Sequence, residues 1–257
     1  MVDELHRLDA ARKPRSDVGS YRVPEGTRVY AVGDIHGRPD LLEAIRGRIL
    51  IDCGRDPPDH RIVVYLGDYL DRGPNGRGVI EALIASPLPG FESIHLKGNH
   101  EALMLDFLET GDNIEIWLFN GGRQTLKSYG VEVSDLFKAK PDAALIRGQL
   151  IDALASEHLE FLKSLRLSYC QGDYVFVHAG IRPGIRLDDQ KPFDLMWIRQ
   201  EFLNAVEDFG FRVVHGHTWS PHPVVRANRI GIDTGAFDSG CLTCLVLEGD
   251  GYRFLRS

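Results

Sequence analysis

Gly67-Asp68-Tyr69-Leu70-Asp71-Arg72-Gly73 follows directly on an unbroken apolar run at 62–66. A run this short and this apolar is typical of a strand that is buried on both faces. Open α/β sheets bind their ligands at the carboxyl ends of such strands, so this stretch carries Asp68, Asp71 and Arg72 to a place where ligands bind. A lone Asp-Arg-Gly is more often a plain surface turn, and the prediction therefore depends on whether the same arrangement recurs.

The arrangement recurs twice. Gly33-Asp34-Ile35-His36-Gly37 follows a predicted strand at 28–32, and Gly98-Asn99-His100-Glu101 follows another at 92–97. A helix is expected after each loop, the first beginning at Pro39, which is a favoured first-turn residue. Strand, loop and helix therefore alternate three times, which predicts an α/β fold with crossover helices.

The carboxyl-terminal half shows further strand patterns. A strand at 174–177 ends in His178-Ala179-Gly180, and one at 212–214 ends in His215-Gly216-His217-Thr218. Three closely spaced strands are predicted beyond them, at 229–232, 241–247 and 251–255. We expect this half to form a second, largely antiparallel sheet that packs on the first.

Two segments differ from this pattern. Residues 1–27 are polar and are expected to form a loosely attached leader before a catalytic domain at 28–257. Residues 111–166 have helical patterns without a cluster of ligand-type side chains. We expect a helical insertion there, which either packs beside the site or takes part in substrate selection.

Composition excludes several classes of protein. The chain has 257 residues, and 30 basic against 37 acidic residues give a formal net charge of −7. With no basic block to offset that charge, nucleic acid and anionic membranes are not expected partners. No apolar stretch reaches the roughly 18 residues that span a bilayer, and residues 1–20 lack the apolar core of a signal peptide, so we expect a cytoplasmic protein.

Cysteine usage points the same way. Four cysteines in this length do not make a disulfide framework. Cys241 and Cys244 have the CxxC spacing but lie in a strand-like run, where residues three apart face opposite sides. They are expected to be a buried structural pair of thiols rather than a zinc or redox site.

The side chains collected at the predicted strand ends are carboxylates, imidazoles and one amide. This mixture suits manganese, iron or zinc better than calcium or copper. It also exceeds what one tetrahedral zinc needs and matches two ions that share a bridging carboxylate. The residues are Asp34, His36, Asp68, Asn99, His178 and His217.

The motifs at 33–37, 67–73 and 98–101 resemble the three signature motifs of the phosphoprotein phosphatase family of metallophosphoesterases. His178-Ala179-Gly180 and Gly216-His217-Thr218 resemble its two later metal motifs, in the form typical of bacterial serine/threonine protein phosphatases. The resemblance runs from about Arg28 to the end of the chain. It implies the calcineurin-like metallophosphoesterase fold, in which a two-sheet mixed β-sandwich is flanked by helices.

The resemblance also implies two divalent ions, manganese first, with iron or zinc as alternatives. Their ligand sets share Asp68 as a bridge. The sets are Asp34, His36 and Asp68 for one ion, and Asp68, Asn99, His178 and His217 for the other. His217 is preferred because the family's ligand directly follows a glycine, and His215 is the alternative.

The implied chemistry is hydrolysis of phosphoserine and phosphothreonine by direct attack of a metal-bridging hydroxide, with phosphotyrosine as a further candidate. Arg72 and Arg199 would grip the phosphate in the fork that only a guanidinium offers, beside Asn99 and His100. His100 would protonate the leaving group, and Asp71 would hold its ring. An arginine in the position of Arg199, after an aromatic residue, is also ordinary on a protein surface.

The substrate would be a phosphorylated protein or a small phosphoester. A symmetrical diadenosine tetraphosphate hydrolase is the main alternative, because it shares these motifs. The insertion shows no basic cluster for a long polyphosphate, which favours the protein phosphatase. A third hypothesis is a non-catalytic metal-binding module. The presence of Asp71, Arg72 and His100 argues against it, because metal binding alone does not need them.

Overall fold

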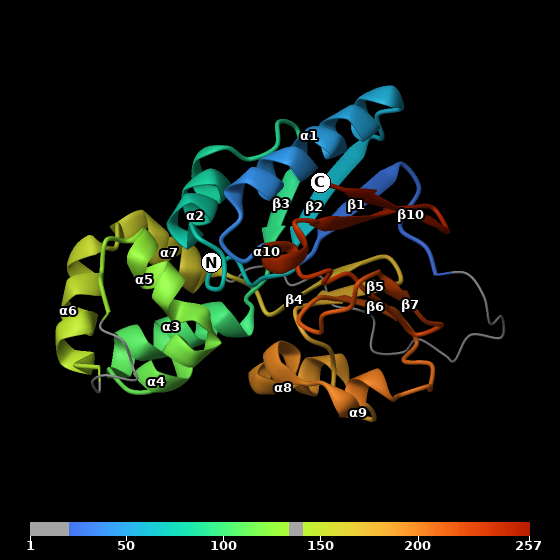
Figure 1. Ribbon diagram of the computed structural model, residues 1–257. Helices are drawn as coiled ribbons and strands as arrows, with labels where there is room; N and C mark the ends of the chain where they lie inside the picture. Colours follow the sequence, from blue (N-terminus) through green and yellow to red (C-terminus); the bar gives the residue numbers. More distant parts are fainter. Residues whose placement is uncertain (1–20, 134–140) are drawn as a thin grey trace, which may run out of the picture.

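The computed structural model describes residues 21–133 and 141–257. Figure 1 shows two β-sheets that lie over one another, helices on their outer faces, and a group of helices at one side. The architecture confirms the predicted α/β fold with a two-sheet mixed sandwich flanked by helices.

The first sheet has five strands in the order β10-β9-β1-β2-β3. Strands β1, β2 and β3 are parallel, as the crossover pattern predicted, while β9 pairs antiparallel with both β1 and β10. The strands are β1 (Thr27–Val32), β2 (His60–Tyr65), β3 (Glu92–His95), β9 (Thr243–Glu248) and β10 (Gly251–Arg256).

The second sheet also has five strands, in the order β4-β5-β6-β8-β7. Its three central strands β5, β6 and β8 are parallel, and the two edge strands are antiparallel to them. The strands are β4 (Ser168–Gln171), β5 (Tyr174–Val177), β6 (Arg212–His215), β7 (Val224–Val225) and β8 (Arg229–Gly231).

Helices lie on the outer face of each sheet. Helices α1 (Pro39–Arg55) and α2 (Gly76–Ala85) lie beside the first sheet, and α8 (Pro192–Trp197) and α9 (Gln200–Leu203) lie beside the second (Figure 1). The short helix α10 (Ala236–Ser239) follows β8, and a 3-10 turn, η2 (Leu187–Asp189), precedes α8.

A largely helical segment follows β3. It begins with α3 (Asn99–Thr110), which starts in the predicted ligand loop. The later elements are α4 (Ile114–Trp117), the wide turn η1 (Leu118–Gly122), α5 (Arg123–Ser128), α6 (Ala143–Ala153) and α7 (Ser156–Ser164). Figure 1 shows these helices grouped beyond the edge of the first sheet.

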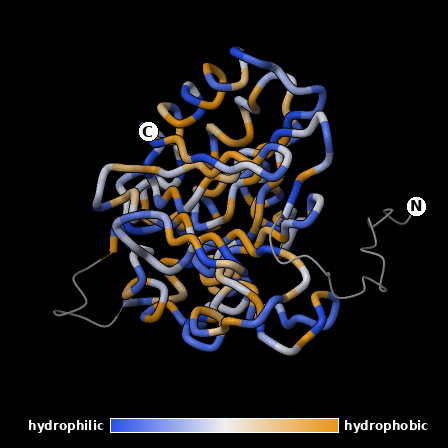
Figure 2. The backbone as a smooth tube through the Cα atoms, turned by 90° about the vertical axis from the view of Figure 1, so that its right-hand side faces the viewer, coloured by the Kyte–Doolittle hydropathy of each residue, from blue (hydrophilic) through white to orange (hydrophobic). Residues whose placement is uncertain are grey.

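Alternation along the strands divides the core into layers. In β1, Val29 and Ala31 join the apolar cluster between the two sheets, whereas Tyr30 and Val32 join the cluster under the helices. Phe176 of β5 enters the layer between the sheets from the opposite side. Figure 2 shows hydrophobic segments running through the middle of the molecule and many hydrophilic segments on its outer loops.

The expectation that the carboxyl-terminal half forms a largely antiparallel second sheet was wrong. Strands β9 and β10 belong to the first sheet, and the middle of the second sheet is parallel. Strand β9 is buried on both faces, with Cys244 in the layer under the helices and Leu245 between the sheets. Such a strand needs an inner position, which it takes beside β1.

The terminal segment before β1 is partly described. Residues 1–20 of the expected leader lie outside the described residues, while Val23 is buried and its N–H donates to Gly249 O at 2.9 Å. Cys241 and Cys244 are free thiols. Cys244 is buried, as expected, whereas Cys241 is only half-buried and precedes β9 instead of lying in it. Among the described residues no helix is long and apolar enough to cross a membrane.

Candidate metal centre

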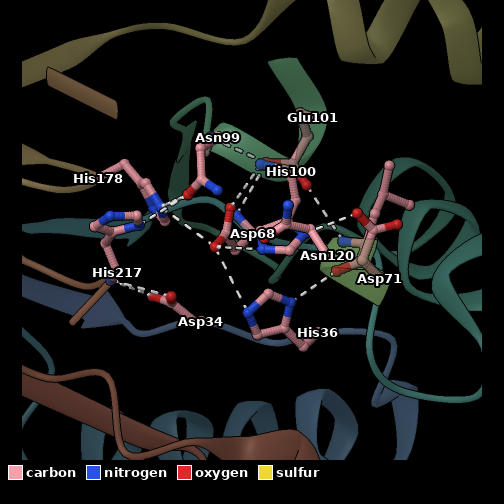
Figure 3. A network of polar contacts seen from close by, with 12 residues as sticks. Asp34, His36, Asp68, Asp71, Asn99, His100, Glu101, Asn120, His178 and His217 are labelled. Atoms are coloured by element: carbon pink, nitrogen blue, oxygen red, sulfur yellow. Dashed lines mark hydrogen bonds and ion pairs between the residues drawn. The ribbon is translucent and has the colours of Figure 1, made fainter. Parts of the chain in front are cut away.

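Loops at the carboxyl ends of five strands meet between the two sheets, and together they carry the predicted ligands. Strands β1, β2 and β3 of the first sheet lead to Asp34 and His36, to Asp68, and to Asn99. Strands β5 and β6 of the second sheet lead to His178 and His217. All of these side chains are buried, and Figure 3 shows them turned toward one another.

Asp68 lies at the middle of the group. Its Oδ2 is 3.5 Å from His36 Nε2, 3.3 Å from His178 Nε2 and 3.8 Å from His100 Nε2. One carboxylate oxygen therefore faces imidazoles from three separate loops, as a bridging ligand between two ions has to.

A second set of close contacts surrounds Asn99. Its Oδ1 lies 3.0 Å from His178 Nε2 and 2.8 Å from His217 Nδ1. Neighbouring ligand atoms in an octahedral shell with bonds of about 2.1 Å are about 3 Å apart. Asn99, His178 and His217 thus have the separations of atoms that share one cation, and a carboxylate oxygen of Asp68 lies within 4.8 Å of ring nitrogens of both histidines.

Asp34 lies at the rim of the group. Its two carboxylate oxygens accept the backbone N–H of His217 at 3.2 and 3.0 Å. A Cβ at Gly216 would collide with this carboxylate, and a Cβ at Gly98 would collide with that of Asp68. Both glycines make room for ligand-type groups.

The histidine rings are oriented for ligation. His36 Nδ1 lies 2.8 Å from Leu70 O and His178 Nδ1 lies 2.9 Å from Leu66 O, so in both rings Nδ1 is placed to donate to a carbonyl and Nε2 is the nitrogen that faces the site. The Nε2 atoms of His36 and His100 are buried without any hydrogen-bond partner. Buried nitrogens of this kind call for an ion or a water, and the donor set therefore fits divalent cations.

His215 does not join the group. Its ring packs edge-on against Phe202, with centroids 5.1 Å apart, and its Nδ1 lies 3.1 Å from Gly216 O. The structure brings His217 to Asn99 and leaves His215 against Phe202, because the regular alternation of the strand ends at His215 and the backbone turns at His217, which has φ 60°.

The backbone at the site is strained. In the described part of the chain, five of the six non-glycine residues with positive φ are predicted site residues: His36, Asp68, Asp71, Arg72 and His217. Such conformations cost about 1–3 kcal/mol each and persist where the surroundings over-determine them. The fold therefore holds these side chains in directions that their local sequence does not favour.

His100 and Asp71 form a buried pair beside the ligand group. His100 Nδ1 lies 2.7 Å from Asp71 Oδ2, and both side chains are 0 % exposed. The ring's other nitrogen faces Asp68 (Figure 3). The pair thus presents one imidazole nitrogen to the site and anchors the other on a carboxylate.

The two predicted phosphate-binding arginines differ in setting. Arg72 is half-buried, and its guanidinium lies 5.4 Å from the centroid of the Phe237 ring, over its face. Arg199 is exposed and directly precedes α9. Phe237 was not predicted as a site residue, because nothing in its local sequence links it to Arg72.

A family model described as calcineurin-like phosphoesterase matches residues 27–240. The chain belongs to the calcineurin-like phosphoesterase family. It is therefore a metal-dependent phosphoesterase, of a family that uses a dinuclear metal centre.

Relatives of this phosphoesterase carry two kinds of name. Serine/threonine-protein phosphatase 2 of Escherichia coli is 37% identical over 84% of this chain and 90% of that protein. A symmetrical bis(5'-nucleosyl)-tetraphosphatase of Dechloromonas aromatica is 31% identical over 60% of this chain and 44% of that protein. A crystal structure titled as a putative diadenosine tetraphosphatase superimposes with a TM-score of 0.61 over 93% of this chain and 99% of that one, at 20% identity, and shows the same fold.

One residue that supports the phosphoesterase site was missed from the sequence. Glu101, fully buried, accepts backbone N–H groups of Asp68, Tyr69 and Leu70 through its two oxygens, at 2.8 to 3.2 Å, and that of Gly98 at 2.9 Å. It thus ties the loop at 67–73, which follows β2, to the start of α3. Its position three residues after a helix-capping glycine was the available signal.

Two residues of the helical insertion were also missed. Trp117 Nε1 donates to Asp71 Oδ2 at 3.0 Å, and Thr125 Oγ1 donates to Asp71 Oδ1 at 2.5 Å. The sequence had predicted no contribution of ligand type from this insertion. No local pattern links residues that meet Asp71 only through the fold.

The charges at the phosphoesterase site suit cations. Burial lowers the pKa of His36 to about 3 and that of His217 to about 2, so both rings are neutral, as ligation requires. Burial and the neighbouring carboxylate of Asp233 raise the pKa of Asp34 well above its usual range. A divalent ion would offset the cost of burying these carboxylates together.

In His178 and Asp68, unlike in His36, His217 and Asp34, the attraction of opposite charges outweighs burial, and both side chains favour their charged forms. Burial opposes a charge on His178, but Asp68 outweighs it and raises the pKa of His178 to about 10. Burial likewise opposes a charge on Asp68, yet His178 and His100 hold its pKa well below the usual range. Because a proton and a metal ion compete for His178 Nε2, ion binding there releases a proton.

Proposed function

We propose that this phosphoesterase is a serine/threonine protein phosphatase, which hydrolyses phosphoserine and phosphothreonine monoesters and also accepts phosphotyrosine. The observation that carries the proposal is the 37% identity to the Escherichia coli phosphatase over 90% of that protein, compared with 26% to an asymmetrical tetraphosphatase of Halalkalibacterium halodurans over 87% and 31% to the symmetrical one over 44%. The cytoplasmic location expected from the sequence stays a prediction.

The insertion supports the same choice. Arg147 donates to Leu108 O and Glu109 O at the end of α3, at 2.8 and 3.2 Å, and Arg123 donates to Val133 O at 3.2 Å. Both guanidinium groups donate to backbone carbonyl groups at a helix end and in a loop, and they do not form a cluster that could bind a polyphosphate. These two arginines are therefore not placed to hold a four-phosphate chain.

Two divalent ions would be held by sets of residues that share Asp68. We propose manganese, because carboxylate, imidazole and amide oxygen in mixture suit an intermediate metal, with iron or zinc as alternatives. When bound, the ions would supply a water of lowered pKa and neutralise charge on the phosphate. The sets are Asp34, His36 and Asp68, and Asp68, Asn99, His178 and His217.

The remaining residues bind and orient. Arg72 and Arg199 grip the phosphate oxygens through guanidinium N–H groups, with the Asn99 side chain beside them. His100 Nε2 faces the centre and donates a proton to the leaving oxygen, while Asp71 keeps the other ring nitrogen protonated. Since the phosphoryl group needs no covalent partner, binding and charge carry the catalysis.

The test is phosphate release from phosphoserine, phosphothreonine and phosphotyrosine peptides, measured beside cleavage of diadenosine tetraphosphate in manganese. Asp68→Asn is the blank. Peptide turnover well above dinucleotide cleavage is the expected result. The reverse would reassign the enzyme to the tetraphosphatase class, and silence on all four substrates would favour a metal-binding module without catalysis.

A further inference from the structure

We infer that Trp117 and Thr125, both in the helical insertion, are positioning residues for the His100 general acid and act on it through Asp71. The inference rests on the proposed function, in which His100 protonates the leaving group. It assigns to the insertion a role in the reaction itself, beyond packing or substrate selection.

Three side chains hold the Asp71 carboxylate. Thr125 Oγ1 donates to Oδ1 at 2.5 Å, and His100 Nδ1 lies 2.7 Å from Oδ2. Trp117 Nε1 lies 3.2 Å from Oδ1 and 3.0 Å from Oδ2, so the indole N–H bridges the two oxygens. Trp117, Thr125, Asp71 and His100 are each 0 % exposed, and solvent cannot replace any of these donors.

The contacts fix the plane of the carboxylate. With only the His100 contact, the carboxylate could rotate about its Cβ–Cγ bond and the imidazole would follow. Thr125 also accepts the Asp71 N–H at 2.9 Å, which holds the backbone at φ 66°. Because local sequence does not favour this conformation, Asp71 needs support from outside its own loop.

The same segment also approaches Arg72. The Arg72 N–H donates to Gly121 O at 3.3 Å, and Gly121 has φ 103°. A Cβ at Gly121 would meet Arg72 N at 2.7 Å, and a Cβ at Gly122 would meet the Trp117 indole at 2.7 Å. The Gly121-Gly122 pair thus lets η1 close on Asp71 and Arg72 together.

The step that this support serves is cleavage of the phosphoester. The bond from phosphorus to the leaving oxygen breaks as a bond to the oxygen of water forms. The leaving oxygen keeps the bonding pair and takes the proton of His100 Nε2, and the proton that water loses passes to solvent, from which the imidazole is protonated again. A rotated imidazole delivers that proton poorly, and the loss is greatest for a leaving group that cannot depart as an anion.

The experiment compares two leaving groups in the full-length enzyme loaded with manganese. The leaving group of a phosphoserine peptide is the serine alkoxide, which needs a proton from the general acid. The leaving group of p-nitrophenyl phosphate is a stable phenolate, which does not. In Trp117→Phe and in Thr125→Val, we expect kcat on the peptide to fall about ten-fold and kcat on p-nitrophenyl phosphate to fall less than about two-fold, with KM unchanged. Thr125→Ser keeps a hydroxyl and should restore the peptide rate.

Two further variants serve as the positive and the negative control. His100→Asn should show the same preference at larger size, about 100-fold or more on the peptide. Tyr129→Phe removes another buried hydrogen bond of the insertion, that of the hydroxyl with His158 Nδ1 at 2.9 Å, without contacting Asp71. It should change neither rate.

Several outcomes would overturn the inference. Equal losses on both substrates, no loss, or the same loss in Tyr129→Phe would make Trp117 and Thr125 ordinary packing residues, as would a fall in bound metal measured by mass spectrometry. If His100→Asn is selective while Trp117→Phe and Thr125→Val are not, the inference fails and the proposed function stands. If His100→Asn is itself unselective, the general-acid role fails and the inference falls with it.

Discussion

Asp68 and Glu101 show how single carboxylates serve the site in opposite ways. Asp68 turns Oδ2 toward imidazoles from three loops and is suited to cations. Glu101 turns away from the centre and accepts backbone N–H groups from the Asp68 loop and from Gly98. Asp68 is the proposed ligand of the ions, and Glu101 ties the loop that carries it to the start of α3.

Glu101→Gln should destabilise the protein. A glutamine has one acceptor oxygen where the carboxylate has two, and its NH2 group would face backbone N–H donors that need an acceptor. With two buried N–H groups unsatisfied, we expect the free energy of unfolding to fall by about 2–4 kcal/mol. Urea unfolding of the native protein and the variant measures this free energy.

The matched control is Glu81→Gln. Glu81 pairs with Arg77 at 2.8 Å on an exposed face of α2, and its loss should cost under about 1 kcal/mol. Equal losses in the two variants would show that the buried amide contacts of Glu101 contribute no more than a surface ion pair.

At the scale of elements, each ligand loop depends on the strand before it and on the helices packed beside it. Strand β3 leads to Asn99, and its last residue, His95, stacks on Tyr65 with centroids 5.1 Å apart. His95 Nε2 is buried without a hydrogen-bond partner, and burial lowers the His95 pKa to about 4. We therefore expect the strand before Asn99 to lose stability in acid.

His95→Phe should reduce the acid sensitivity of folding. Between pH 6.5 and 4 the unfolded chain takes up a proton on His95 that the folded chain does not, so stability falls as pH falls through this window and not below it. The variant keeps the stacking and removes the titration. Its unfolding free energy should change by about 1–3 kcal/mol less over this window.

Denaturant unfolding at several pH values measures this difference. Above pH 7 the two proteins should differ by a constant amount, since His95 is neutral in both states there. Parallel pH profiles from pH 7 to pH 4 would contradict the assignment and point to other groups as the source of acid sensitivity.

At the scale of the whole molecule, the site joins the two sheets. Asp34, His36, Asp68 and Asn99 come from loops of the first sheet, and His178 and His217 come from loops of the second. Ions held by residues of both sheets, as proposed, would bind the folded chain and not the unfolded one. Metal should therefore stabilise the sandwich as a unit.

Metal removal should lower the melting temperature. Manganese at about 100 times its dissociation constant adds about 2.7 kcal/mol, which for a chain of this size is a rise in Tm of about 5–10 °C. Calorimetry with manganese and with EDTA checks it. Asp68→Asn is the control, because it should show little difference between the two conditions, and an unchanged Tm in the native protein would argue against ions shared by both sheets.

The sequence by itself determined eight of the ten described strands, the loops after them and the types of ligand that they carry, because burial patterns and turn residues are local properties. The two strands that it did not predict, β4 and β7, are short edge strands of the second sheet. Only the tertiary structure decided that β9 and β10 join the first sheet, that His217 and not His215 faces Asn99, and that Trp117 and Thr125 hold Asp71. Those two residues lie 46 and 54 positions from Asp71 along the chain. Contacts at such separations depend on how the intervening helices pack, and that packing is a property of the whole fold.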